Sequence, residues 1–221
     1  MKIGIIDSGI SSVYSTDNSA IRGVFLKKHS SSNEIISSKS IDDNIGHGSE
    51  CYKIISSLVN DVEYFIVKIF DREMISDVDL LAAGIQICID EGTDVINISA
   101  GVRHNAIPKL LSTCCDEAYR RNIALIAAGP ILQEQCFPAY YEKVIGVGST
   151  ELTIGELYRY NSAHEIEFYT SASDLYPAHV TWSASTSFSC AKMTAYATQI
   201  IQVKGRISLE ELKSELICKL N

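Results

Sequence analysis

The sequence has no long apolar run, few prolines and no surplus of basic residues. A membrane-spanning helix needs about 20 consecutive apolar residues, and no segment approaches that length. The 4 prolines and 13 glycines are scattered along the chain, which excludes collagenous and low-complexity proteins. The 19 Lys and Arg residues stand against 27 Asp and Glu, a formal net charge of −8, so few cations are available to bind phosphates. We therefore expect neither a membrane nor a nucleic acid as partner.

An export signal and a disulfide pattern are also missing. The N-terminal segment reaches the acid Asp7 after only a few apolar residues, which is unlike a secretory signal. The seven cysteines are odd in number and contain no CxxC spacing. They are Cys51, Cys88, Cys114, Cys115, Cys136, Cys190 and Cys218. We expect free thiols, a cytoplasmic location, and structural packing for the adjacent pair Cys114 and Cys115.

The residues that are present predict one α/β domain spanning residues 1–221, because apolar strand-like runs alternate with helical patterns. Strands are expected at residues 2–7, 62–70, 94–99, 123–128 and 143–149. Helices are expected at residues 51–58, 77–91, 105–122, 186–203 and 208–220. Residues 11–46 are polar, with one short strand-like stretch at 34–37, and residues 154–182 suggest short antiparallel strands. This order predicts a mostly parallel sheet with helices on both faces, a three-layer arrangement.

Three residue types typical of nucleophilic acyl transfer follow these predicted elements. Asp7 ends the first strand, His47 lies between two glycines before a helix, and Ser187 opens another helix. A serine hydroxyl becomes a strong nucleophile when an imidazole takes its proton, and a carboxylate orients that imidazole. Because ligands of open α/β sheets bind at the carboxyl ends of strands, these side chains are expected to meet there.

The sequence resembles the subtilisin-like serine peptidases over roughly residues 2–204. Three blocks carry the resemblance: Ile5-Ile6-Asp7-Ser8-Gly9, Gly46-His47-Gly48-Ser49 and Ser185-Thr186-Ser187-Phe188-Ser189 look like the aspartate, histidine and serine motifs of the family. Secondary motifs lie between them in the family's order: Val95 to Gly101, Ala127-Ala128-Gly129, Phe137-Pro138-Ala139 and Val144 to Ser149. The ordered set, rather than any single block, makes the resemblance specific.

The resemblance implies a subtilisin-like fold and a role for each matching residue. Ser187 would be the nucleophile, with its backbone N–H stabilising the oxyanion, His47 the general base and acid, and Asp7 its orienting partner. The backbone of Ser99, Ala100 and Gly101 would pair with an extended substrate. The residues Ala127, Ala128 and Gly129 would line the pocket for the side chain before the cleaved bond.

The sequence departs from the family pattern beside these residues. Pro130 stands where the family has an asparagine that donates to the oxyanion, and loss of such a donor lowers kcat about 10²–10³-fold in a subtilisin. Gln133 and Gln135 are candidate substitutes, or solvated loop residues. Other departures are Ser185, Phe188, Ala191 and Lys192, in the places of glycine, methionine, proline and histidine.

The resulting expectation is a cytoplasmic serine endopeptidase that acts on a peptide or protein, needing no metal and no organic cofactor. The chain is short and Asp7 follows Met1 closely, which suggests a reduced catalytic core without a prodomain and a narrow substrate such as a precursor or leader peptide. Two alternatives stay open: a weak or inactive peptide-binding scaffold, and a transpeptidase or macrocyclase with the same triad. The acidic pairs Asp42–Asp43 and Glu210–Glu211 are expected to be solvated, and no loop is acidic enough to predict a calcium site.

Overall fold

The main sheet places β1 near its middle and has parallel strands on both sides of it. The computed structural model describes residues 1–15, 20–75, 77–130, 134–171 and 186–220. Within those residues, nine strands form one sheet that is parallel except at its two ends, where β10 pairs with β11 and β2 with β3. In spatial order they are β10 (Arg159–Tyr160), β11 (Phe168–Thr170), β9 (Ile145–Ser149), β7 (Ala124–Ala128), β5 (Val95–Ile98), β1 (Lys2–Asp7), β4 (Glu63–Lys68), β2 (Ile21–Lys28) and β3 (Ile35–Ser38).

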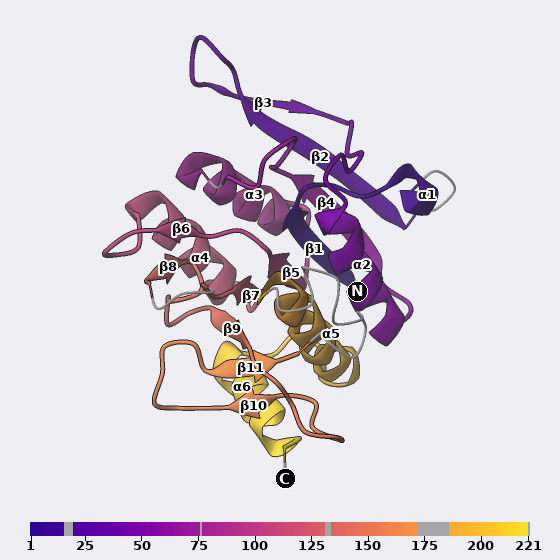
Figure 1. Cartoon of the computed structure of the whole chain (residues 1–221), viewed down its shortest axis with the longest axis vertical. Coiled ribbons are helices and arrows are strands. Elements are labelled where there is room, and N and C mark those ends of the chain that lie inside the picture. The colour runs from indigo at the N-terminus through magenta and orange to yellow at the C-terminus, as the bar shows by residue number, and fades with distance from the viewer. Residues whose placement is uncertain (16–19, 76, 131–133, 172–185, 221) are drawn as a thin grey trace.

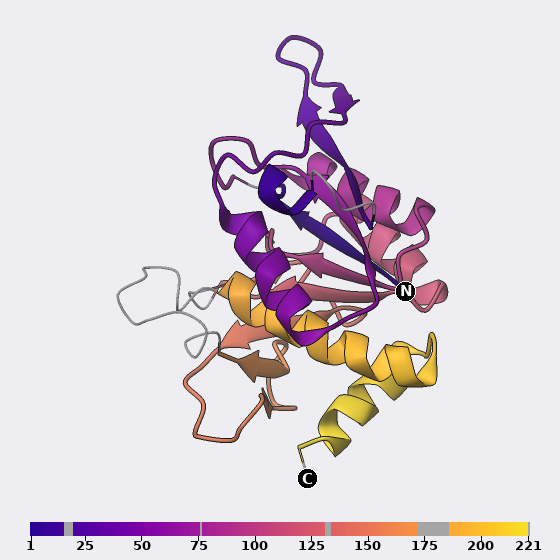
Figure 2. The ribbon, with the colours of Figure 1, turned by 90° about the vertical axis from the view of Figure 1, so that its right-hand side faces the viewer.

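Helices cover both faces of this sheet (Figure 1). The helices α3 (Val78–Asp90) and α4 (Lys109–Arg120) pack on one face. The helices α2 (His47–Leu58), α5 (Thr186–Lys204) and α6 (Leu209–Cys218) pack on the other, where α2 and α5 lie side by side (Figure 2). Since side chains alternate along a strand, Ile6 of β1 joins the core under α3, whereas Ile3 and Ile5 join the core under α2. The predicted three-layer α/β fold is confirmed.

Two helix starts have the capping residues that the sequence predicts. The Asp77 carboxylate accepts hydrogen bonds from the backbone N–H groups of Asp79 and Leu80 at the start of α3. The Ser208 hydroxyl accepts one from Glu211 N–H at the start of α6. These side chains satisfy N–H groups of the first turn and so fix where each helix begins. In the described ranges, no helix is both long and apolar enough to cross a membrane.

The structure differs from the sequence prediction in two places: it contains the unexpected strand β2, and the helix expected at residues 105–122 is shorter. The strand β2 pairs in parallel with β4, but only Ile21 and Leu26 of its eight residues are buried, because it lies next to the exposed edge strand β3. Its weak apolar signal was therefore hidden in a polar segment. The helix expected from residue 105 begins at Lys109, because Pro108 adopts an extended backbone with ψ 138°.

Smaller elements complete the described chain. The helix α1 (Ser12–Ser15) follows the β1 loop, and β6 (Val102–Arg103) pairs antiparallel with β8 (Cys136–Phe137). The antiparallel pair of β10 and β11 agrees with the expectation for residues 154–182, of which 172–182 lie outside the described residues. All seven cysteines are free thiols, as predicted. Cys114 and Cys115 lie on the buried face of α4 and join the core there.

Candidate active site

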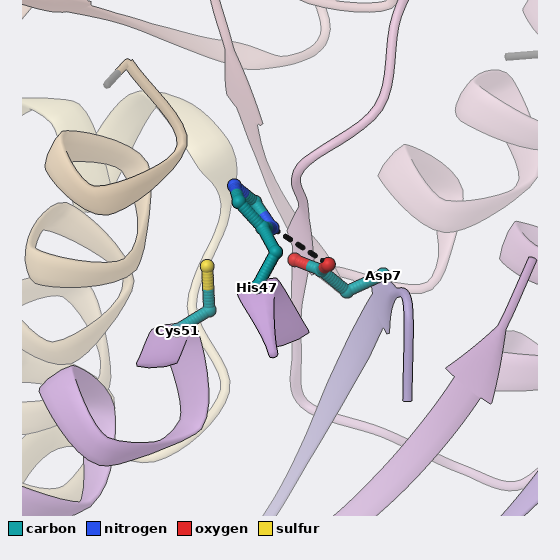
Figure 3. A group of neighbouring side chains, drawn as sticks. All are labelled: Asp7, His47 and Cys51. Carbon is teal, nitrogen blue, oxygen red and sulfur yellow. Dashed lines mark hydrogen bonds and ion pairs between the residues drawn. The ribbon is translucent and has the colours of Figure 1, made fainter. Parts of the chain in front are cut away.

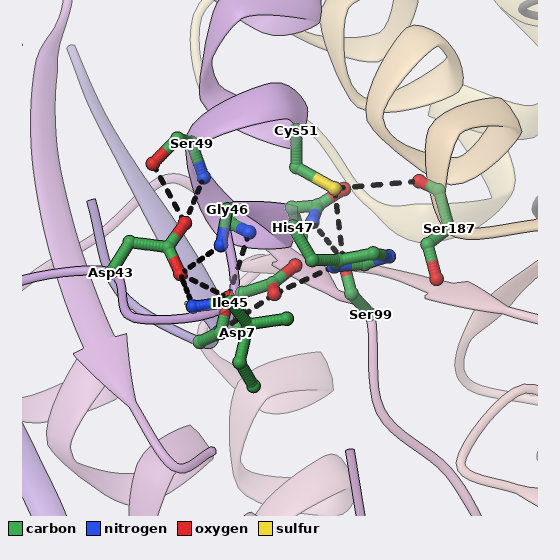
Figure 4. Close-up of polar contacts among 12 residues, drawn as sticks. Asp7, Asp43, Ile45, Gly46, His47, Ser49, Cys51, Ser99 and Ser187 are labelled. Atoms are coloured by element: carbon green, nitrogen blue, oxygen red, sulfur yellow. Dashed lines mark hydrogen bonds and ion pairs between the residues drawn. The ribbon is translucent and has the colours of Figure 1, made fainter. Parts of the chain in front are cut away.

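The three residues expected to form a triad come from three distant segments. Asp7 is the last residue of β1, His47 is the first of α2, and Ser187 is the second of α5. Asp7 is 0 % exposed, whereas His47 and Ser187 keep 8 % and 9 % exposure. In Figure 4 the imidazole lies between the Asp7 carboxylate and the Ser187 side chain. This order suits an orienting acid placed behind two groups that meet a substrate.

A short hydrogen bond joins Asp7 to His47 (Figure 3). The distance from His47 Nδ1 to Asp7 Oδ1 is 2.8 Å, and the backbone N–H of Ser8 donates to the same oxygen at 2.7 Å. An ionised carboxylate only accepts hydrogen bonds, so the bonded imidazole carries a proton on Nδ1. In the neutral ring, Nε2 is then the unprotonated nitrogen that can act as a base.

Two glycines allow the His47 segment to approach β1 closely. Gly46 at the start of α2 has φ 90°, a left-handed conformation that favours glycine. A Cβ atom on Gly48 would lie 2.3 Å from the carbonyl oxygen of Gly9, so a side chain there would push α2 away from the loop that follows Asp7. The Gly-His-Gly sequence therefore sets the short distance between His47 and Asp7.

The imidazole of His47 is also held by packing. The ring of Phe188, in α5, stacks on it with centroids 5.3 Å apart and planes 26° from parallel. On the same helix as His47, the Cys51 thiol lies 3.5 Å from Ser99 Oγ and 4.0 Å from the backbone oxygen of Ser187. Phe188 stands where the family usually has methionine, and here its ring restricts the orientation of the His47 imidazole.

In the described part of the chain, one group of donor side chains is compact enough to bind a metal ion. The donor atoms of Asp7, His47 and Cys51 lie within 4.8 Å of one another (Figure 3). The Nδ1 atom of His47 is already bonded to Asp7, and burial together with the charge of Asp7 raises the pKa of the Cys51 thiol well above its usual value. A neutral thiol is a weak metal ligand, so we interpret this cluster as acid–base machinery.

The pKa of His47 leads to a prediction for the pH dependence of activity. Burial of the ring lowers this pKa, but the charge and hydrogen bond of Asp7 and the charge of Asp43 outweigh burial and raise it above 6.5. A general base must be unprotonated, so kcat/KM is expected to fall with decreasing pH, with the midpoint of the acid limb above 6.5. A profile of kcat/KM from pH 5 to 9 tests this, and an acid limb centred below pH 6.5 would contradict it.

The segments expected to bind substrate lie directly after β5 and at the end of β7. Ser99, Ala100 and Gly101 come directly after β5, and Ser99 Oγ accepts a hydrogen bond from Asn97 Nδ2 at 3.1 Å. Ala127 is fully buried in the core, Ala128 is the last residue of β7, and Gly129 follows the strand. Pro130 comes next and offers no N–H donor.

The remaining departures from the family pattern are placed only in part. Ser185 and Gln133 lie outside the described residues, and Gln135 is exposed. Ala191 and Lys192 are buried in α5, where Lys192 Nζ donates to the backbone oxygen of Ser171 at 2.9 Å. The lysine that replaces the usual histidine therefore joins α5 to the residue after β11.

One expectation for the acidic pairs is wrong. Glu210 and Glu211 are exposed in the first turn of α6, as predicted. Asp43, in contrast, is partly buried and accepts hydrogen bonds from the loop before His47 and from the first turn of α2. Its donors are mostly backbone N–H groups, which have no signature in a sequence. The available signal was the glycine at the start of α2, which has no side chain to cap the helix.

The site also includes Cys51, whose role the sequence interpretation missed. The sequence predicts only a free thiol at this position, although Cys51 comes four residues after His47. Residues four apart lie on the same face of a helix, so the spacing could have placed this thiol beside the base.

Comparisons with known proteins agree with this architecture. The model of the subtilase family matches residues 1–220. The minor extracellular protease Epr of Bacillus subtilis is 24 % identical over 213 residues, 89 % of this chain and 30 % of that protein. Subtilisin DY of Bacillus licheniformis is 24 % identical over 98 % of this chain and 82 % of its own length. The chain thus spans about a third of the length of Epr.

Solved structures with the same fold include two peptidases with named roles. The nisin leader peptidase NisP from Lactococcus lactis has a TM-score of 0.68 at 17 % identity, with 97 % of this chain and 81 % of that chain covered. A lanthipeptide protease has a TM-score of 0.67 at 15 % identity, with 96 % and 78 % covered. The family match over nearly the whole length carries the assignment: this chain belongs to the subtilase family of peptidases.

Proposed function

We propose that this protein is a serine endopeptidase that cleaves a specific precursor peptide. The observation that carries the proposal is the 2.8 Å hydrogen bond between buried Asp7 and His47, with Ser187 at the start of the neighbouring helix α5. The same arrangement also suits general base catalysis in other hydrolases, and the family assignment favours peptide bonds.

The proposed reaction has two halves. In the first, Ser187 Oγ attacks the carbonyl carbon of the substrate while His47 Nε2 takes its proton, and Asp7 stabilises the imidazolium. This attack gives a tetrahedral intermediate. When His47 donates the proton to the leaving amine, the peptide C–N bond breaks and an acyl-enzyme ester remains on Ser187. In the second half, water attacks the ester carbonyl while His47 takes one of its protons. His47 then returns that proton to Ser187 Oγ, the ester bond breaks, and the new carboxyl end of the peptide leaves.

Stabilisation of the oxyanion is assigned to the start of α5. Backbone N–H groups in the first turn of a helix point toward an anion, and the helix dipole adds partial positive charge there. The N–H of Ser187 lies in that turn. With Pro130 in the position of the usual asparagine, we infer that the oxyanion receives less support than in most relatives.

The precursor-peptide substrate is proposed from the solved relatives. Two of them are described as a nisin leader peptidase and a prenylagaramide maturation protease; the latter has a TM-score of 0.63 at 15 % identity, with 92 % of this chain and 76 % of that chain covered. Those names apply to those proteins, and their shared fold makes a single precursor the best substrate class to test here. The free state of all seven cysteines suits a reducing compartment, so we also propose that the protein acts in the cytoplasm.

Labelling with a fluorophosphonate tests the proposed function directly. We expect the folded protein to form a covalent adduct on Ser187, which peptide mapping by mass spectrometry would locate. No adduct on Ser187 in folded protein would favour a peptide-binding scaffold, the alternative that Pro130 supports. If the protein is reactive, the masses of its peptide products are measured next. Products without the mass of one added water would indicate transpeptidation rather than hydrolysis.

A further inference from the structure

The carboxylate of Asp43 is the centre of the loop that leads to His47. Five donors surround it within 3.1 Å. Its Oδ1 accepts from Ser8 Oγ at 2.8 Å, Ile45 N–H at 3.1 Å and Gly46 N–H at 2.8 Å. Its Oδ2 accepts from the backbone N–H of Ser49 at 2.8 Å and from its hydroxyl at 2.7 Å. Figure 4 shows Asp43 with its contacts to Ile45, Gly46 and Ser49, near the Asp7–His47 pair.

This carboxylate takes over a task that the N-cap residue of α2 cannot perform. Gly46 occupies the N-cap position of α2 and has no side chain to accept hydrogen bonds from the first turn. Asp43 supplies that acceptor from three residues earlier, since it binds the N–H of Ser49, the third residue of α2. A negative charge at a helix N-terminus also interacts favourably with the helix dipole.

The same carboxylate connects the segment that contains Asp7 to the segment that contains His47. Ser8, directly after Asp7, donates its hydroxyl hydrogen to Asp43. The Ser8 oxygen in turn accepts a hydrogen bond from the backbone N–H of Gly48 at 2.9 Å, directly after His47. A shift of the Asp43 carboxylate would therefore be transmitted to both residues of the Asp7–His47 pair.

We propose that Asp43 is a positioning residue that holds His47 at its distance from Asp7 and adds negative charge beside the imidazole. The inference rests on the proposed function, because it assigns to Asp43 a part in the same acid–base machinery. Asp43 does not itself touch the reacting atoms; it acts through Ser8, Gly46 and Ser49.

The charged surroundings of His47 make the electrostatic part testable. Among the residues that the structure describes, the titratable groups that act on it are Asp7 from β1, Asp43 from the loop before α2, and the neutral thiol of Cys51 from α2. From α5 the imidazole meets the uncharged ring of Phe188. The pKa of Asp43 is itself below its usual value, because its hydrogen bonds outweigh the opposing effect of burial, so the carboxylate is charged wherever His47 titrates.

The decisive variant is Asp43→Asn, with Asp71→Asn as matched control. Asparagine offers one acceptor oxygen instead of two, so part of the loop loses its hydrogen bonds, and the negative charge disappears. Asp71→Asn removes the same charge from an exposed carboxylate in the neighbouring loop. There Asp71 Oδ1 accepts a hydrogen bond from Asn44 Nδ2 at 2.9 Å and forms an ion pair with Lys68 Nζ at 3.3 Å. We expect Asp43→Asn to lower kcat about tenfold to a hundredfold with little change in KM, and Asp71→Asn to leave both unchanged.

A second readout does not depend on turnover. In a Ser187→Ala background, NMR titration of the His47 ring is expected to give a lower pKa with Asp43→Asn and an unchanged pKa with Asp71→Asn. Equal kcat and an equal His47 pKa in the Asp43→Asn protein would overturn the proposal. If the parent protein cleaves no peptide and forms no adduct, the proposed function fails, while the titration still decides the role of Asp43.

A further variant covers the case in which Asp43→Asn does not fold. Asp43→Glu keeps the charge and both acceptor oxygens but moves them by one methylene group. The proposal then expects a His47 pKa close to that of the parent protein together with a lowered kcat, because charge is kept and position is not. An unchanged kcat in folded Asp43→Glu would contradict the positioning role.

Discussion

Replacing Ser187 with alanine is expected to lower kcat on the order of 10⁶-fold, because the variant has no hydroxyl to form the acyl-enzyme. The substitution removes one oxygen at the start of α5 and leaves the Asp7–His47 hydrogen bond in place. What remains is the catalysis that binding and the N–H groups of the first turn provide without a nucleophile. Cleavage of the precursor peptide, followed by mass spectrometry over hours, measures the residual rate.

Ser189→Ala is the matched control for that variant. Ser189 lies two residues further along α5, is fully buried, and donates its hydroxyl to the backbone oxygen of Thr170 at 3.0 Å. Its loss removes an identical atom from the same helix, and we expect folded Ser189→Ala to cleave at nearly the parent rate. Retained cleavage by Ser187→Ala, in contrast, would mean that another group is the nucleophile.

The second large effect is expected for Asp7→Asn, with a loss of about 10⁴-fold in kcat. Asparagine has nearly the same shape, so the buried position at the end of β1 should remain filled. Its amide, however, can donate to His47 Nδ1, which would move the ring proton to Nε2. The ring would then present a proton to Ser187 where a base needs a lone pair.

The pH dependence distinguishes this tautomer effect from simple misfolding. Since Asp7 raises the pKa of His47, the Asp7→Asn variant is expected to show its residual acid limb at a lower pH than the parent protein. Circular dichroism and thermal unfolding check that the fold is kept. A loss of less than tenfold in folded protein would show that the imidazole does not depend on Asp7 for its orientation.

The sequence predicts the central strands well, and it places Asp7 and His47 at the ends of neighbouring elements, for a physical reason. Strands buried on both faces of a parallel sheet need continuous apolar runs, and β1 is such a run that stops at Asp7. The Gly-His-Gly sequence likewise marks a sharp helix start. These signals are local. They are therefore sufficient to place Asp7 at the end of a strand and His47 at the start of a helix.

The features that the sequence did not predict depend on neighbours far away in the chain. The strand β2 is held by pairing with β4 and β3, while most of its side chains stay partly or fully exposed. Asp43 looks like a surface acid until the folded loop brings five donors to it. Both features are stabilised largely by backbone N–H and C=O groups, which nearly every residue type carries and which therefore leave no mark on composition.

The position of α5 in the fold has a consequence for the synthesis of this protein. This helix carries Ser187 and contributes to both apolar clusters on its face of the sheet, with Met193 and Phe188 among the buried side chains. A chain that has left the ribosome only as far as β11 contains Asp7 and His47, but neither Ser187 nor the helix that covers these clusters. Because domains fold as units, Asp7, His47 and Ser187 come together only after α5 has been synthesised and has packed on the sheet, so any peptidase activity is expected to arise late.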